Sequence, residues 1–284
     1  MSVTVTPVSR AVDPVSTKHT HTVIFLHDGI DTFPNKVLGN RSSNGKTLPE
    51  AFPSHKWVFL SSFVSIENNE EGKENMKPWY IRFERADSTY GGLRESIDTI
   101  KTAITGELAY LTTENVILCG VGRGCAAASR ALLNGAFTIR GFIGFGGWLG
   151  YLDDLGSNLS NGLLNEKPAR PGALVNTSSL KTPKSPQSHK DSSTTGSNPQ
   201  FGDNGEQLPL RGLTILIGQS RGDKNVSRLS GQTLYTALIK KGASGNRREY
   251  DHNLSSVMSR EGIDDMIDFM NVNFPADSKW CCIV

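Results

Sequence analysis

The sequence predicts an α/β fold, in which a mainly parallel sheet is covered by helices on both faces. Apolar strand segments alternate with amphipathic helical segments along most of the chain. One apolar run, Val116–Cys119, meets a tight glycine turn and then a helix-forming stretch, Ala126–Leu133. The length of 284 residues accommodates one large domain of this class or two small ones.

The first part of the chain is expected to supply two strands and the clearest helix. Residues 1–19 are polar with scattered prolines and predict a flexible arm. Strands are expected at 22–27 and 56–60, and the charged stretch 67–77 predicts an exposed loop. A helix is predicted over 93–111, because apolar residues recur there at steps of three and four: Leu93, Ile97, Ile100, Ile104, Leu108 and Leu111.

The second part continues the alternation after the glycine turn. Further strands are expected at 141–145, 213–218 and, more weakly, 248–250. Leu229 to Ile239 predicts an amphipathic helix that ends at Lys240, Lys241 and Gly242. Ile263 to Met270 predicts the last helix, with Ser259 as its N-cap and Glu261 in its first turn.

One segment does not fit this alternation. Residues 157–209 are rich in Ser, Thr, Asn, Pro, Gly and Lys, with Phe201 as their only aromatic residue. Such a composition buries too little apolar surface to offset an ordering cost of about 1–2 kcal/mol per residue. The sequence therefore predicts a folded domain over 20–275, interrupted by a disordered insertion at 157–209 and followed by a tail at 276–284.

Composition excludes several classes of function. A net charge of +2 with 20% charged residues gives no basis for nucleic-acid binding. No secretory signal and no run of about 20 apolar residues is present, so we expect a cytoplasmic location. No metal-ligand spacing occurs and no cofactor is expected. Cys119 and Cys125 are expected to pack as small apolar groups.

The glycine turn at 120–124 has two functional interpretations, beside that of a plain structural turn. Strand, sharp turn and helix form the frame of a nucleophile elbow, whose central residue is normally serine. Here that residue is Gly122. Gly120, Gly122 and Cys125 also approach the dinucleotide fingerprint G-x-G-x-x-G/A, but Arg140–Leu149 lacks the acidic residue that would hold the ribose.

Several blocks in order resemble one family, the phospholipase/carboxylesterase group of α/β-hydrolases that includes acyl-protein thioesterases, in its fungal form. They are Val23–His27 with Asp31-Thr32, Thr47–Pro53, Lys56–Phe59, Tyr90–Ile97, Gly144–Leu149, Gly218–Asp223 with Val226, and Tyr250 with Glu261–Asp265. The resemblance covers roughly residues 20–155 and 210–273. It implies a minimal α/β-hydrolase fold without a lid domain.

The same resemblance assigns positions to the catalytic groups. Gly122 stands at the nucleophile position, which is thus vacated, and Ser255 stands at the vacated histidine position. Asp223 alone stands where the triad acid is expected. The oxyanion amides would come from Gly29 and Arg123.

Without serine and histidine, turnover should fall by about a millionfold. We therefore expect a non-catalytic pseudo-hydrolase that binds an acyl chain, a lipidated protein or another protein partner. The alternative is an active carboxylic-ester or thioester hydrolase with a rearranged site, in which His252 is the substitute base. Cys125 and Ser129 follow the elbow inside a helix and are expected to face packing partners.

The last residues, Cys281-Cys-Ile-Val284, fit the prenylation motif C-a-a-X, with Cys281 as the candidate. Valine is atypical in the final position, and no polybasic stretch precedes the motif. An unmodified cysteine tail is the equal alternative. Membrane association is expected only if Cys281 is prenylated.

Overall fold

The structure is a computed structural model that describes residues 9–16, 18–27, 33–60, 64–65, 75–76, 79, 93–149, 208–224, 226–251 and 259–275. The positions Gly29, His252, Ser255 and Cys281 lie outside these ranges, as does the predicted insertion apart from its last two residues.

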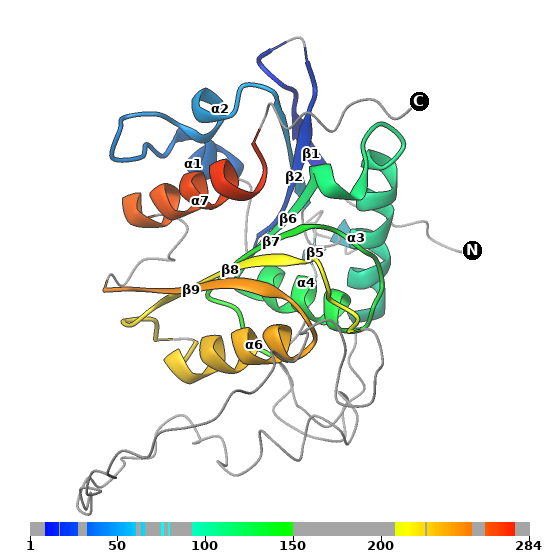
Figure 1. The fold of residues 1–284 in the computed structure, drawn as a ribbon, viewed down its shortest axis with the longest axis vertical. Helices are drawn as coiled ribbons and strands as arrows, with labels where there is room; N and C mark the ends of the chain where they lie inside the picture. The colour runs from blue at the N-terminus through cyan, green and yellow to red at the C-terminus, as the bar shows by residue number, and fades with distance from the viewer. Residues whose placement is uncertain are drawn as a thin grey trace, which may run out of the picture.

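A seven-stranded sheet forms the centre of the molecule, in the order β1-β3-β2-β6-β7-β8-β9 (Figure 1). Its strands are β1 (Ser9–Val12), β2 (His21–Leu26), β3 (His55–Leu60), β6 (Val116–Val121), β7 (Gly141–Phe145), β8 (Thr214–Ser220) and β9 (Ser244–Tyr250). Strand β1 pairs antiparallel with β3, and the other neighbours pair in parallel. The strands β2, β6 and β7 are buried along their whole length, as expected for a parallel sheet that is covered on both faces.

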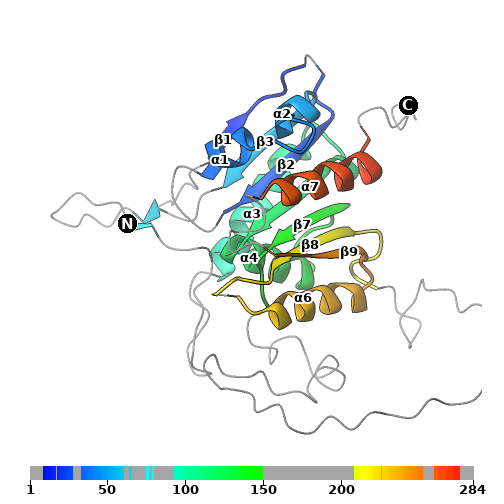
Figure 2. The ribbon, with the colours of Figure 1, turned by 90° about the vertical axis from the view of Figure 1, so that its left-hand side faces the viewer.

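Helices cover the two faces of this sheet. One face carries α3 (Leu93–Glu107), α4 (Arg123–Leu133) and α6 (Arg228–Lys240), whose apolar residues join one buried cluster. The other face carries α1 (Phe33–Gly39), α2 (Leu48–Ala51) and α7 (Arg260–Asn273), which join a second cluster. Figure 2 shows α6 and α7 on opposite sides of β7, β8 and β9. The short elements are the 3-10 turn η1 (Thr113–Asn115) and a two-stranded ladder of β4 (Val64–Ser65) and β5 (Asn75–Met76).

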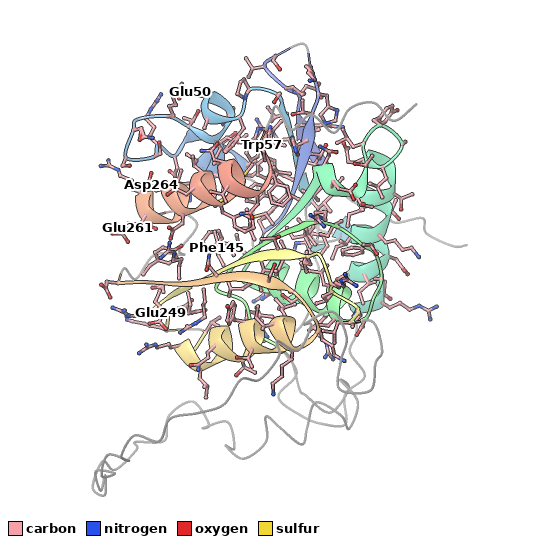
Figure 3. The ribbon with its side chains drawn as sticks, viewed as in Figure 1. Glu50, Trp57, Phe145, Glu249, Glu261 and Asp264 are labelled. Atoms are coloured by element: carbon pink, nitrogen blue, oxygen red, sulfur yellow. The ribbon has the colours of Figure 1, made fainter. Side chains whose placement is uncertain are left out.

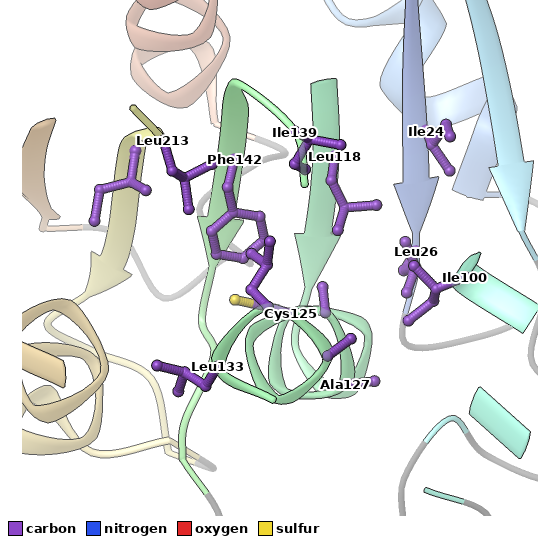
Figure 4. Close-up of a cluster of buried hydrophobic side chains, with 14 of the residues drawn as sticks. Ile24, Leu26, Ile100, Leu118, Cys125, Ala127, Leu133, Ile139, Phe142 and Leu213 are labelled. Carbon is purple, nitrogen blue, oxygen red and sulfur yellow. The ribbon is translucent and has the colours of Figure 1, made fainter. Parts of the chain in front are cut away.

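Small side chains on α4 let this helix lie close to the sheet. Cys125 and Ala127 are fully buried, and so are Leu118 on β6 and Phe142 on β7 (Figure 4). Ser129 also lies inside this helix and donates its hydroxyl to the Cys125 carbonyl at 2.7 Å. The elbow helix is therefore fixed by dense packing directly behind the turn that precedes it.

The predicted α/β class and the parallel sheet are confirmed. The last two predicted helices, α6 and α7, are also confirmed. Ser259 is the N-cap of α7, and its side chain accepts the Gly262 N–H at 3.0 Å. Thr47–Pro53, one of the blocks that resemble the family, contains the short helix α2.

Four local predictions were wrong. The arm predicted over 1–19 contains the edge strand β1, whose pairing partner lies far along the chain and leaves no local signal. The helix predicted over 93–111 ends at Glu107, although its apolar stripe continues in the following turns. Strand β9 begins at Ser244 and not at 248 as predicted. Its first residues are polar and half-exposed, as in an edge strand, so they carry no apolar run. The loop predicted at 67–77 contains β5.

Candidate functional site

The turn between β6 and α4 has the geometry of a nucleophile elbow. Gly122 has φ 55° and ψ −119°, a conformation that side chains rarely adopt. Its N–H donates to the Phe145 carbonyl at 2.8 Å, and its carbonyl accepts the Ala126 N–H at 3.0 Å. Gly122 is thus fixed at the carboxyl ends of β6 and β7 and immediately precedes α4.

Two further glycines make the elbow possible through close packing. A Cβ on Gly120 would lie 2.5 Å from the Cα of Cys125. A Cβ on Gly124 would collide with the backbone carbonyl of Leu26 at the end of β2. The sequence G-x-G-x-G is therefore accounted for by contacts within the fold: one glycine adopts the strained turn and two allow helix and strands to approach.

The predicted acid, Asp223, lies in the loop after β8. Its Oδ1 accepts the Val226 N–H at 3.0 Å. Its Oδ2 lies 3.6 Å from the position that a Cβ on Gly146 would occupy. Gly146 directly follows Phe145, whose carbonyl accepts the Gly122 N–H, so Asp223 and Gly122 lie at the same edge of the sheet.

A buried glutamine on β8 binds the loop that carries Asp223, here called the acid loop. Gln219 is fully buried, and its Nε2 donates to the Val226 carbonyl at 3.1 Å. Its Oε1 has no hydrogen-bond partner among the described residues and faces the backbone of Gly231 in α6. The sequence analysis included Gln219 only as part of the block Gly218–Asp223 that resembles the family. Its position at the end of an apolar strand was the available signal for a role in holding the loop.

An ion-pair cluster ties the acid loop to β9. Glu249 accepts hydrogen bonds from Arg228 at 2.7 Å, Arg221 at 3.1 Å and Arg247 at 2.7 Å. These bonds, with that from Arg228 the largest contribution, lower the pKa of Glu249 to about 2. Figure 3 shows Glu249 between β9 and α6. Arg221 also pairs with Asp251, the residue before His252. Arg221 thereby links the loop that carries Asp223 to Asp251, which directly precedes the candidate base His252 in the sequence.

The structure brings together only part of the predicted site. Gly122, Arg123 and Asp223 lie at the carboxyl edge, with Arg123 exposed as the first residue of α4. The positions of Gly29, His252 and Ser255 stay predictions, because these residues are outside the described ranges. His27, at the end of β2, is buried.

Neither described cysteine is suited to act as a nucleophile. Cys125 is fully buried, and burial raises the pKa of its thiol to about 12. Cys119 is also buried with a raised pKa. The prediction that both pack as apolar groups is confirmed. Within the described ranges, no group of three or more His, Cys, Asp or Glu residues could hold a metal ion.

Residues 9–163, more than half of the chain, match the sequence profile of the phospholipase/carboxylesterase family. The chain belongs to this family of α/β-hydrolases. Comparison with curated proteins gave no match. The family assignment favours the elbow over the dinucleotide interpretation of the glycine turn.

Solved structures support the same fold at low sequence identity. Acyl-protein thioesterase 2 of Zea mays is 16% identical with a TM-score of 0.56, over 93% of this chain and 98% of that one. SOBER1 of Arabidopsis thaliana is 16% identical with a TM-score of 0.54, over 89% and 98%. The Bacillus cereus carboxylesterase is 12% identical with a TM-score of 0.52, over 94% and 95%. The chain thus spans almost the whole of each structure.

The described part of the chain contains no helix with the length and apolar content needed to cross a bilayer.

Proposed function

We propose that this chain is a non-catalytic member of its hydrolase family that binds an acyl chain, free or on a lipidated protein, without cleaving it. The observation that carries the proposal is Gly122, which occupies the apex of an otherwise intact elbow. A glycine has no hydroxyl or thiol to attack a carbonyl carbon. The resemblance also places a serine, Ser255, at the histidine position, so base and nucleophile would both be missing.

The acyl-chain part of the proposal rests on the family and on the names of the related structures, which include acyl-protein thioesterases. The resemblance implies an apolar cleft beside the elbow, and loss of a serine side chain would remove the reaction and leave that cleft in place. A protein-scaffold role would use the same fold without a lipid ligand. The cytoplasmic location and the modification of Cys281 stay predictions of the sequence.

One observation favours the alternative of an active enzyme with a rearranged site. Asp223 is kept at the acid position, and its loop is tied through Arg221 to Asp251, directly before His252. An imidazole that reaches Asp223 from this loop could act as a base for an activated water.

Hydrolysis assays separate the two functions. The purified full chain would be offered short- and long-chain p-nitrophenyl esters and an acyl-thioester. We expect turnover about a millionfold below that of a hydrolase with an intact triad, because both the nucleophile and the base are absent. Turnover that disappears in a His252→Gln variant would instead establish the rearranged enzyme.

A double variant, Gly122→Ser with Ser255→His, tests whether the frame survives. Any gained activity should be lost again when Asp223→Asn is added, because the acid orients the base. Gly122→Ser places a side chain at φ 55°, which costs about 1–3 kcal/mol, so folding is checked by urea unfolding.

Acyl binding is measured separately with dansylated undecanoic acid as the probe. Saturable fluorescence enhancement that palmitate reverses is the expected result. Absence of saturable binding, with no turnover, would favour the scaffold role.

A further inference from the structure

Two histidines form a stacked pair at the edge of the sheet opposite the candidate site. His21 begins β2 and His55 begins β3, and the two are direct partners in the parallel register. Their ring centroids are 4.6 Å apart with an interplanar angle of 20°. Both are buried, with exposed fractions of 2% and 1%. The sequence analysis did not single out either residue.

The pair is the contact point of several peripheral elements. The Phe52 ring, at the end of α2, lies 4.9 Å from that of His55. Phe274, which ends α7, meets His21 edge-on at 6.5 Å and reaches the start of β7, where a Cβ on Gly141 would lie 2.6 Å from its Cζ. The segment after β1 is attached beside the pair, where the Thr20 N–H donates to the Ser54 carbonyl at 3.0 Å.

The hydrogen bonds of His21 fit a neutral ring. The Thr112 hydroxyl donates to Oδ1 of Asn115 at 2.8 Å, which orients the amide so that its Nδ2 faces Nε2 of His21 at 3.1 Å. With this amide orientation Nε2 accepts, and Nδ1, 3.0 Å from the Thr20 hydroxyl, is the nitrogen that carries the proton. A proton added at Nε2 would place two donors against each other.

His55 is still less able to carry a charge. Neither of its ring nitrogens has a hydrogen-bond partner among the described residues. Burial, followed by the charges of His21 and His19, lowers the pKa of His55 to about 3. Burial and His19 lower that of His21 to about 4. These contributions come from burial and from imidazoles, and no described carboxylate is among them.

The charged groups nearest this edge are already satisfied. Lys56 on β3 pairs with Glu107 of α3 at 2.8 Å, and the other oxygen of Glu107 accepts the Thr22 hydroxyl at 2.8 Å. His19 meets Thr22 through Nε2 at 2.9 Å. From α2 and α7 the groups that face the two rings are Phe52 and Phe274, which are apolar. On η1, next to Asn115, Glu114 accepts the Thr113 hydroxyl at 3.2 Å, and no described carboxylate contributes to the lowered pKa of His21 or His55.

We propose that the stacked His21–His55 pair is an acid-sensitive latch, which holds the last turn of α7 and the segment after β1 against the sheet. An opened state exposes both imidazoles, whose ordinary pKa is about 6.5. As pH falls below that value, the opened state binds protons that the closed state excludes, so opening becomes more favourable. The edge strand β1 and the end of α7 open before the central strands, because more of their residues are exposed.

Hydrogen exchange of the full chain, followed by mass spectrometry at pH 7 and pH 5, tests the latch. After correction for intrinsic exchange rates, protection should fall by about tenfold or more per titrating histidine. We expect this loss in peptides covering 9–20 and 269–275, with β6 and β7 unchanged. Equal loss in the central strands, or no loss at all, would overturn the proposal.

The matched variant is His55→Phe, which keeps an aromatic ring in the stack and removes one titrating group. It should fold at pH 7. The ratio of its protection at pH 7 to its protection at pH 5 should be about tenfold smaller than in the parent. His189→Gln is the control and should behave as the parent does. If His55→Phe fails to fold, NMR titration of the imidazole Cε1–H groups in the parent decides. Titration of either ring near pH 6.5 without change in the amide spectrum would refute the latch.

Discussion

Asp223 has a structural contact that does not depend on catalysis. Its carboxylate accepts the Val226 N–H, while Gln219 donates to the carbonyl of the same residue. The two side chains thus hold both peptide groups of Val226 and determine the shape of the loop between β8 and α6. This contact explains why the acid can remain in a chain whose elbow has Gly122 at its apex.

Substitutions at Asp223 distinguish a structural from a catalytic role. Asp223→Asn keeps an acceptor oxygen and should change the free energy of unfolding little. Asp223→Ala removes the acceptor and should cost about 1–2 kcal/mol in urea unfolding. If Asp223 oriented a catalytic base, the Asn variant would keep its stability and lose an ester hydrolysis activity that the parent possesses.

At the level of elements, the elbow depends on how closely α4 approaches β2 and β6. Gly120 and Gly124 meet backbone atoms, which cannot move aside as the end of a flexible side chain can. In contrast, Gly106 near the end of α3 has no atom within 4 Å of the position of an added Cβ. These glycines share a residue type but differ in what surrounds them.

Gly124→Ala should therefore destabilise the fold by about 2–3 kcal/mol, because β2 and α4 must separate. The matched control, Gly106→Ala, should stabilise it by about 0.5–1 kcal/mol, because alanine is the better helix former. Chemical denaturation of both variants gives the two values. A Gly124→Ala variant as stable as the parent would mean that the elbow is packed more loosely than described.

In the molecule as a whole, β7 and β8 are neighbours although a long stretch of sequence separates them. Phe145 pairs with Gly218, and Leu210 and Leu213 belong to the same buried cluster as Phe142. The intervening 157–209 contributes few apolar residues by composition. The segment between β7 and β8 in the sequence must connect the two strands, but its composition gives it little apolar surface to pack against the domain.

Deletion of residues 165–204 should leave the domain folded, with a melting temperature within about 2 °C of the parent. Circular dichroism melts of both chains measure this. A decrease of more than about 5 °C would show that the segment contributes to the core.

The two edges of the sheet carry different groups. The carboxyl edge holds Gly122, Asp223 and the ion pairs around Glu249. The amino edge holds the histidine pair and the ends of β1 and α7. Acid should therefore act first on the edge farther from the candidate site.

The sequence by itself determined the fold class, most strands and helices, and the position of the elbow. These features depend on local periodicity and on short motifs, such as the stripe of α3 and the glycines of 120–124, which neighbouring residues define. Through its resemblance to the family it also assigned Gly122 and Asp223 to the positions of catalytic groups.

Only the tertiary structure decided which distant residues meet. The pairing of β1 with β3, the stacking of His21 on His55 and the support of Val226 by Gln219 join groups whose neighbours in sequence carry no such signal. The ionisation of Glu249 and the two histidines is likewise a property of burial and partners, which arise only when the chain is folded. Local pattern specifies elements, whereas their packing sets the electrostatics of both edges.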